Sequence, residues 1–284
     1  MRATKQQPQS GEEESFIGRK WTFYLALIVV VVVVVGGVIA VVISRSKTDE
    51  PTAQPQPGTT ISPQQDRSDW GLPYIDELGF RVEVPPNPNG VALDQDRSGQ
   101  PDRGAADYAA LPPAGVMWQK VQNFPLPFST SDGPSKVDGA LATGFAQTPQ
   151  GAALAGIQLI NRAQSSYAGG AAVLERGSVA DSSELEAERI TNLAAAKQSV
   201  ADGRTGPVGA PLIRQEAYRL KYWSPDYAVI EYAGNNVSGN GWTTAPLEVV
   251  WHDGDWKLKL TNQPNSDKVG STPTLAGWTR WPGK

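Results

Sequence analysis

The segment from Trp21 to Ile43 carries no charged residue and includes seven consecutive valines at Val29–Val35. As an α-helix it would rise about 34 Å, which is enough to cross a bilayer core of about 30 Å. Valine is a modest helix former in water, but in hydrocarbon each unpaired backbone group costs several kcal/mol, so the helix is favoured there. The sequence therefore predicts one transmembrane helix, around which the rest of the chain is organised.

A cleaved signal peptide is the alternative interpretation of this run. Its apolar core would be about 7–15 residues long, with small residues after it, whereas Gly36, Gly37 and Ala40 lie inside this run. More lysine and arginine residues precede the run than closely follow it, which predicts a cytoplasmic N-terminus under the positive-inside rule. We expect an uncleaved, single-pass anchor in the cell membrane, with the long C-terminal region extracytoplasmic.

The composition of the chain excludes several kinds of site. Cysteine is absent, so disulfides, thiolate metal sites and thiolate nucleophiles are not available. The net charge is −4 and the pI is about 5.2, so no basic field indicates direct nucleic-acid binding. An exported domain without disulfides is more typical of a bacterial envelope than of a eukaryotic secretory route.

Changes in composition along the chain predict its domain boundaries. The segment after the apolar run is rich in Pro, Gln, Thr and Ser, and it cannot bury enough apolar surface to offset its ordering entropy. A second stretch rich in Pro, Asn and Gly precedes residue 105. We therefore expect a cytosolic tail (1–20), the transmembrane helix (21–43), a Pro/Gln-rich stalk and linker (44–104), an extracytoplasmic domain (105–261) and a C-terminal tail (262–284).

Within the expected domain the hydrophobic period changes from helical to extended. Thr148-Pro149 and the capping box that begins at Ser183 predict two helix starts, with helices over 151–168 and 183–200. After the helices, apolar residues alternate with polar ones, and the Asp253-Gly254 pair is typical of a tight hairpin turn. This order predicts an α+β fold in which helices pack on one face of a curved antiparallel sheet. The expected strands cover 217–223, 227–233, 247–251 and 256–260.

The chain has a single histidine, His252, which lies beside Asp253 at the predicted hairpin turn. A histidine-dependent triad or metal site would have to rest on this one residue. A solvated side chain next to a tight turn is the simpler interpretation. Asn236 begins a formal glycosylation sequon. We assign no catalytic or cofactor-binding residue and expect no cofactor.

Asp94, Asp96 and Ser98 match the first half of a calcium-binding loop, in which oxygen ligands alternate before a glycine. The second half differs, because position twelve of the loop is Ala105 instead of a bidentate glutamate. A polar linker is therefore the preferred interpretation of this segment. Calcium binding stays open, and no metal site is assigned.

Two tryptophans near the C-terminus lie outside the regular hydrophobic pattern. Trp278 and Trp281 flank Arg280, and aromatic and arginine side chains dominate the hot spots of protein interfaces. The same segment could equally fold back onto the domain. Both alternatives stay open, with Trp278, Arg280 and Trp281 as the candidate partner-contact residues.

Four stretches of the expected domain form a distinctive set: Trp118-Gln-Lys-Val-Gln, Pro125-Leu-Pro-Phe-Ser129, Asp132-Gly-Pro134 and the block GFAQTPQGAALA at 144–155. Through these stretches the sequence resembles an uncharacterised family of actinobacterial single-pass membrane proteins. The layout of tail, span, stalk and outer domain is similar to that of bitopic assembly factors of type IV secretion and conjugation. That second resemblance implies a nuclear-transport-factor-like cone of helices on a curved sheet, and it transfers no site residues.

Two classes of function follow from these observations. The first is a non-enzymatic, membrane-anchored scaffold of an envelope DNA-transfer or secretion apparatus, whose partners are the membrane and other proteins of the envelope complex, with self-association left open. The second is an extracytoplasmic ligand-binding or enzymatic domain with a cone-type pocket, for which Asp226, Tyr222 and Tyr232 are the nearest candidate residues. The sequence favours the scaffold, and we do not expect an enzyme.

Overall fold

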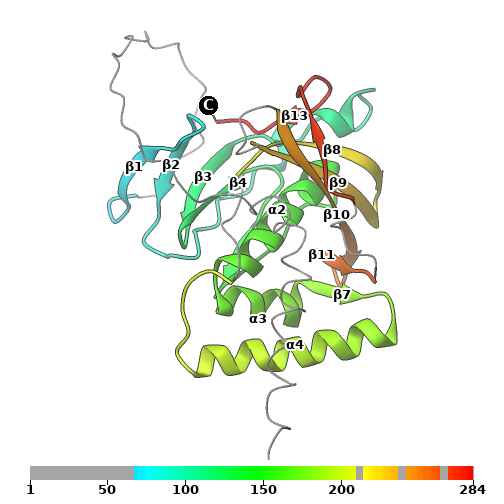
Figure 1. Ribbon diagram of the computed structural model, residues 1–284. Coiled ribbons are helices and arrows are strands. Elements are labelled where there is room, and N and C mark those ends of the chain that lie inside the picture. The colour runs from blue at the N-terminus through cyan, green and yellow to red at the C-terminus, as the bar shows by residue number, and fades with distance from the viewer. Residues whose placement is uncertain (1–66, 209–213, 236–240, 263–267, 284) are drawn as a thin grey trace, which may run out of the picture.

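The computed structural model describes residues 67–208, 214–235, 241–262 and 268–283 (Figure 1). The expected cytosolic tail, the expected transmembrane helix and Asn236 lie outside these residues. Within them, no helix is both long and apolar enough to span a membrane.

The described chain has an α+β fold, as predicted, with three α-helices and mixed sheets. The helices are α2 (Pro149–Ser165), α3 (Tyr167–Arg176) and α4 (Ser183–Ala201). Helix α2 begins where the sequence predicted, because the Thr148 hydroxyl accepts a hydrogen bond from the Gly151 amide at 2.9 Å.

The single helix expected over 151–168 is two helices in the structure. Ser166 has an extended backbone (φ −162°, ψ 156°), and its hydroxyl accepts a hydrogen bond from the Gly169 amide. Ser166 therefore ends α2 and caps α3, a role that serine favours over a helix-interior position.

A seven-stranded sheet contains the predicted antiparallel meander. Its four long strands are β8 (Gln215–Ser224), β9 (Tyr227–Asn235), β10 (Trp242–His252) and β11 (Asp255–Leu260). The expected purely antiparallel sheet is wrong in one respect, because the short strand β7 (Ser178–Ala180) pairs parallel to β11. Two C-terminal strands complete the sheet: β12 (Gly270–Thr272) pairs with β10, and β13 (Thr279–Arg280) pairs with β8.

A second, four-stranded sheet precedes the helices. It has the order β1 (Gly71–Ile75), β2 (Arg81–Val84), β3 (Val116–Val121) and β4 (Phe124–Ser129), with β2 parallel to β3. A separate hairpin follows, formed by β5 (Lys136–Asp138) and β6 (Leu141–Thr143). Two short 3₁₀ turns, η1 (Arg97–Gly99) and η2 (Tyr108–Ala110), lie between β2 and β3.

The expected linker up to residue 104 is folded onto the domain from residue 67 onward, which corrects the predicted boundary. Buried side chains hold its Pro- and Asn-rich backbone in place. The Gln119 amide group both donates to and accepts from the Val91 backbone, each at 2.8 Å, and Arg162 Nη2 donates to the Asn89 carbonyl at 2.9 Å. Such long-range bonds can order a segment whose own composition predicts a linker.

Helix α2 packs against the strands of both sheets, and the largest hydrophobic cluster surrounds it (Figure 1). Its small side chains allow this close approach. Gly156 is the clearest example, because a Cβ atom there would collide with the hydroxyl of Tyr232, which donates to the Ala153 carbonyl at 2.7 Å. The C-terminal tail joins the same fold, and both Trp278 and Trp281 are buried in it.

We expect Gly156→Ala to lower the free energy of unfolding by about 1–3 kcal/mol, since overpacking of a close contact forces the backbone or Tyr232 to move. Gly104→Ala is the matched control, because its new methyl group would meet only ordinary contacts with Asp102. Thermal unfolding of the purified chain, followed by circular dichroism, would measure both. Equal melting temperatures for the two variants would contradict the packing argument.

Candidate functional site

The turn between β1 and β2 is tied to the rest of the domain by one buried ion pair. Arg214, the residue immediately before β8, places its Nη1 2.6 Å from Asp76 Oδ2, and the two side chains are only 5% and 8% exposed. The other carboxylate oxygen of Asp76 accepts hydrogen bonds from the amides of Leu78 and Phe80. Asp76 therefore fixes the shape of the turn and its attachment at the same time.

The Arg214 guanidinium lies against aromatic rings. Its central carbon is 3.6 Å from the ring centroid of Trp118 and 4.7 Å from that of Phe80. Burial lowers the pKa of Arg214 to about 10, and the attraction of Asp76 acts in the opposite direction. The side chain is therefore cationic at neutral pH, and the faces of the two rings stabilise its charge.

The C-terminal segment covers the other side of this aromatic cluster. Trp281 packs edge-on against Trp118 with ring centroids 6.2 Å apart, and it lies 4.5 Å from the ring of Tyr218. The Trp118 indole N–H donates to the Pro282 carbonyl at 2.9 Å. The β1–β2 turn, through Phe80, and the C-terminal segment thus meet at Trp118.

A concave surface, here called the C-terminal groove, lies at this meeting point. It has a volume of about 280 Å³, and Phe80 and Trp281 supply apolar walls while Glu216 and Arg280 supply opposite charges. The Glu216 carboxylate also accepts a hydrogen bond from the Trp242 indole at 3.1 Å, and Arg280 is exposed to solvent. The complete lining is Phe80, Glu216, Arg280, Trp281, Pro282 and Gly283.

The structure brings two of the three sequence-predicted contact residues together in this groove. Arg280 and Trp281 line it. Trp278 instead packs with Ala217 and Leu275, and its ring centroid lies 4.5 Å from the central guanidinium carbon of Arg219. Both tryptophans are buried in the domain. The alternative in which the C-terminal segment folds back onto the domain therefore holds for both of them.

The sequence pattern does not indicate the other groove residues, Phe80 and Glu216. Phe80 lies in the expected linker, and Glu216 precedes the first expected strand. A dense run of hydrophobic residues between Trp70 and Phe80 was the available signal that this part of the chain is folded.

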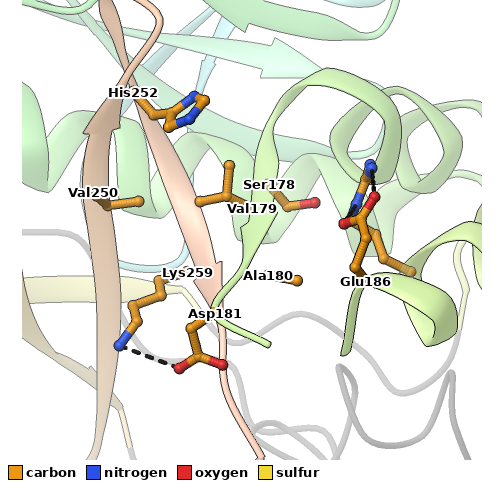
Figure 2. A pocket seen from close by; sticks show the side chains of 9 residues that line it. Ser178, Val179, Ala180, Asp181, Glu186, Val250, His252 and Lys259 are labelled. Atoms are coloured by element: carbon orange, nitrogen blue, oxygen red, sulfur yellow. Dashed lines mark hydrogen bonds and ion pairs between the residues drawn. The ribbon is translucent and has the colours of Figure 1, made fainter. Parts of the chain in front are cut away.

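A second pocket, of about 350 Å³, lies beside β7 and α4 (Figure 2). Its charged side chains are already paired, with Lys259 Nζ 3.4 Å from Asp181 and Arg189 bonded to Glu186 at 2.6 Å. His252 is at its border, at the hairpin turn where the sequence placed it. Its Nδ1 lies 2.9 Å from an oxygen of Asp253, and about half of its side chain is exposed. The remaining lining residues are Ser178, Val179, Ala180 and Val250.

The three residues considered for an enzyme occupy different environments. Tyr232 is buried in the core, and burial raises the pKa of its phenol well above the usual value. Tyr222 is exposed beside Tyr227, and Asp226 accepts a hydrogen bond from the Ser224 hydroxyl at 2.6 Å. Each side chain thus has a contact that accounts for its place in the fold.

In the candidate calcium loop, Asp96 caps the η1 turn. Its carboxylate accepts hydrogen bonds from both the backbone amide and the hydroxyl of Ser98, and these bonds lower its pKa. Among the described residues, no group of three or more histidine, cysteine or acidic side chains is arranged to hold a metal ion.

A family model described as "Domain of unknown function (DUF8175)" matches residues 83–280, from β2 to β13. No curated protein and no solved structure matches the chain.

We expect Asp76→Ala to lower the free energy of unfolding by about 3–5 kcal/mol, because it leaves the Arg214 cation buried without its partner. The double variant Asp76→Ala/Arg214→Met should recover much of this loss, since it removes the charge as well. Urea unfolding of the purified chain would measure both. The exposed pair of Arg176 and Asp138 gives the control, and Asp138→Ala should change little. A double variant no more stable than the single one would contradict the assignment.

Proposed function

The chain belongs to the DUF8175 family of domains of unknown function, and we propose that it is a non-enzymatic, membrane-anchored scaffold of an envelope DNA-transfer or secretion apparatus. The apolar run Trp21–Ile43 supports the anchor, with the N-terminus in the cytoplasm and the domain outside. The resemblance to uncharacterised actinobacterial membrane proteins and to bitopic assembly factors supports the setting.

The order of elements supports a nuclear-transport-factor-like cone as the fold of the α2–β11 region. Two helices, a short strand and a third helix precede a four-stranded meander, and the short strand β7 pairs parallel to the last strand, β11. A cone of this kind places its helices against one face of the sheet, which is where α2 packs. In this protein the face under α2 is filled by large buried side chains such as Trp256 and Ile230.

The C-terminal groove is the surface through which we propose that the scaffold contacts its partners, and it is the observation that carries the proposal. Its apolar lining and two opposite charges suit an extended protein segment with an apolar side chain in the groove and an acidic residue facing the exposed Arg280. The ion pair of Arg214 and Asp76 fixes the turn that carries Phe80. The groove is therefore already formed, and it loses little conformational entropy when a segment binds.

We expect Arg280→Glu in the full chain to abolish co-purification with envelope proteins, since it reverses the exposed charge of the groove. The fold should be unaffected, because Arg280 is exposed. Arg204→Glu is the control, an equal change of charge at an exposed residue after α4. Cross-linking in intact membranes followed by affinity purification would measure both. Capture of the same partners by wild type and Arg280→Glu would contradict the groove as docking site.

Ligand binding is the second candidate function, and the pocket beside β7 is the observation that favours it. Its volume of about 350 Å³ is large enough for a small molecule. A ligand there would have to replace the existing pairs of Lys259 and Arg189, because both cations already have carboxylate partners. That requirement makes it the weaker of the two functions.

We expect His252→Ala to change the free energy of unfolding by less than about 0.5 kcal/mol, as is usual for exposed positions. Co-purification with envelope proteins should also be unchanged, because His252 borders the pocket beside β7 and not the C-terminal groove. Loss of function in His252→Ala with an intact fold would favour the ligand-binding or enzymatic alternative over the scaffold.

A further inference from the structure

Two segments that lie before and after the matched family domain supply the apolar lining of the C-terminal groove. The turn between β1 and β2, residues 76–80, supplies Phe80. The last three described residues, 281–283, supply the rest of this lining and are here called the C-terminal wall. The family model covers residues 83–280, so both segments fall outside the match. The groove is therefore assembled by two additions to the family domain.

Both segments are held by the same side chain of that domain, Trp118 in β3. The ring centroids of Phe80 and Trp118 are 5.1 Å apart. From the C-terminal wall, the Pro282 carbonyl accepts a hydrogen bond from the Trp118 indole at 2.9 Å. A Cβ atom added at Gly283 would lie only 3.1 Å from Cδ1 of the same indole. A displacement of either segment therefore changes the packing of the ring that holds the other.

The chain around Arg214 gives the two segments a second common support. Its guanidinium pairs with Asp76 in the turn, and its central carbon is 3.6 Å from the ring centroid of Trp118. Two residues further on, the Glu216 carbonyl accepts a hydrogen bond from the Trp281 amide at 3.2 Å. Interactions that share a residue in this way are usually non-additive in free energy. The two segments are thus expected to be coupled energetically.

Each segment is also attached by few groups. Strand β1 pairs with β2 alone, and its five residues are all exposed. Phe80 is the one fully buried residue between Gly71 and the start of β2. In the C-terminal wall Trp281 is the one fully buried residue, and the strand before it, β13, has only two residues. Segments with so few buried contacts open locally without unfolding of the core.

We propose that the β1–β2 turn and the C-terminal wall form a two-part latch, in which release of one segment promotes release of the other, and that the C-terminal groove exists only while both are docked. This inference rests on the proposed function for the role of the groove in partner binding. It adds a conformational control of that site. A partner in the groove holds both segments on Trp118, and by linkage the release of either segment weakens the binding of the partner.

Hydrogen exchange of the full chain, measured by mass spectrometry, tests the coupling. We expect Trp281→Ala to speed exchange of the Leu78 and Phe80 amides by about tenfold or more, although it changes no residue of the turn. These amides donate to the Asp76 carboxylate and therefore report whether the turn is docked. In the opposite direction, Asp76→Ala should speed exchange of the Trp281 amide.

Two controls separate release of the latch from general loss of stability. Asp138→Ala removes an exposed ion pair with Arg176 and should leave the exchange of both segments unchanged. The amide of Ile230, a fully buried residue of β9, reports unfolding of the core. Trp281→Phe, which keeps a buried ring, should give the same pattern at about threefold and serves where Trp281→Ala does not fold.

The exchange data can overturn the latch in two ways. Unchanged exchange at Leu78 and Phe80 in the Trp281 variants would show that the two segments are independent. Equal acceleration at these amides and at Ile230 would show that the substitution destabilises the whole domain, and it would also contradict the latch.

Capture of partners by cross-linking in intact membranes tests the link to the groove. Asp76→Ala should lose the partners of the wild type, although Asp76 does not line the groove. Retention of these partners, with fast exchange in the turn, would contradict the need for a docked turn. Coupled exchange in a wild-type chain that captures no partner would contradict the scaffold function and support the latch alone.

Discussion

The buried cation of Arg214 is the interaction on which the arrangement of the chain ends depends. It joins the β1–β2 turn through Asp76, the first sheet through Trp118, and the start of the second sheet through its own place before β8. Burying such an ion costs several kcal/mol unless a partner charge and favourable contacts offset the loss of water. Removing the arginine would therefore detach segments that are far apart in the sequence.

Arg162 in α2 also connects segments that are far apart in the sequence, but it does so through amide and carbonyl oxygens instead of a carboxylate. It is fully buried, and its guanidinium donates to Gln158 Oε1 and to the carbonyl oxygens of Ala140 and Asn89. Burial lowers its pKa to about 9, which shows how strongly this position opposes charge. A planar group with several fixed donors can join a helix, a hairpin and an irregular segment at once, which lysine could not do with the same geometry.

These two arginines explain which parts of the structure could be predicted from sequence. Local signals were sufficient for the helix start at Thr148 and for the Asp253-Gly254 hairpin, because each depends on neighbouring residues. The capping box predicted at Ser183 is one residue late, since the hydroxyl that caps α4 belongs to Ser182. The folded 67–104 segment and the C-terminal groove depend on contacts across the chain. Nothing around Arg214 distinguishes it from a surface arginine, so the partner Asp76, 138 residues away, could not be identified.

The turn of the β1–β2 hairpin is part of the wall of the C-terminal groove. Phe80, at the end of the turn that follows β1, lines this groove. Asp76 holds both ends, because its carboxylate binds the Phe80 amide and the Arg214 guanidinium. Breaking the Asp76–Arg214 pair would therefore move Phe80 together with the turn, and partner binding at the proposed groove would weaken with it. Such coupling needs a hairpin that moves as a unit, which the buried ion pair provides.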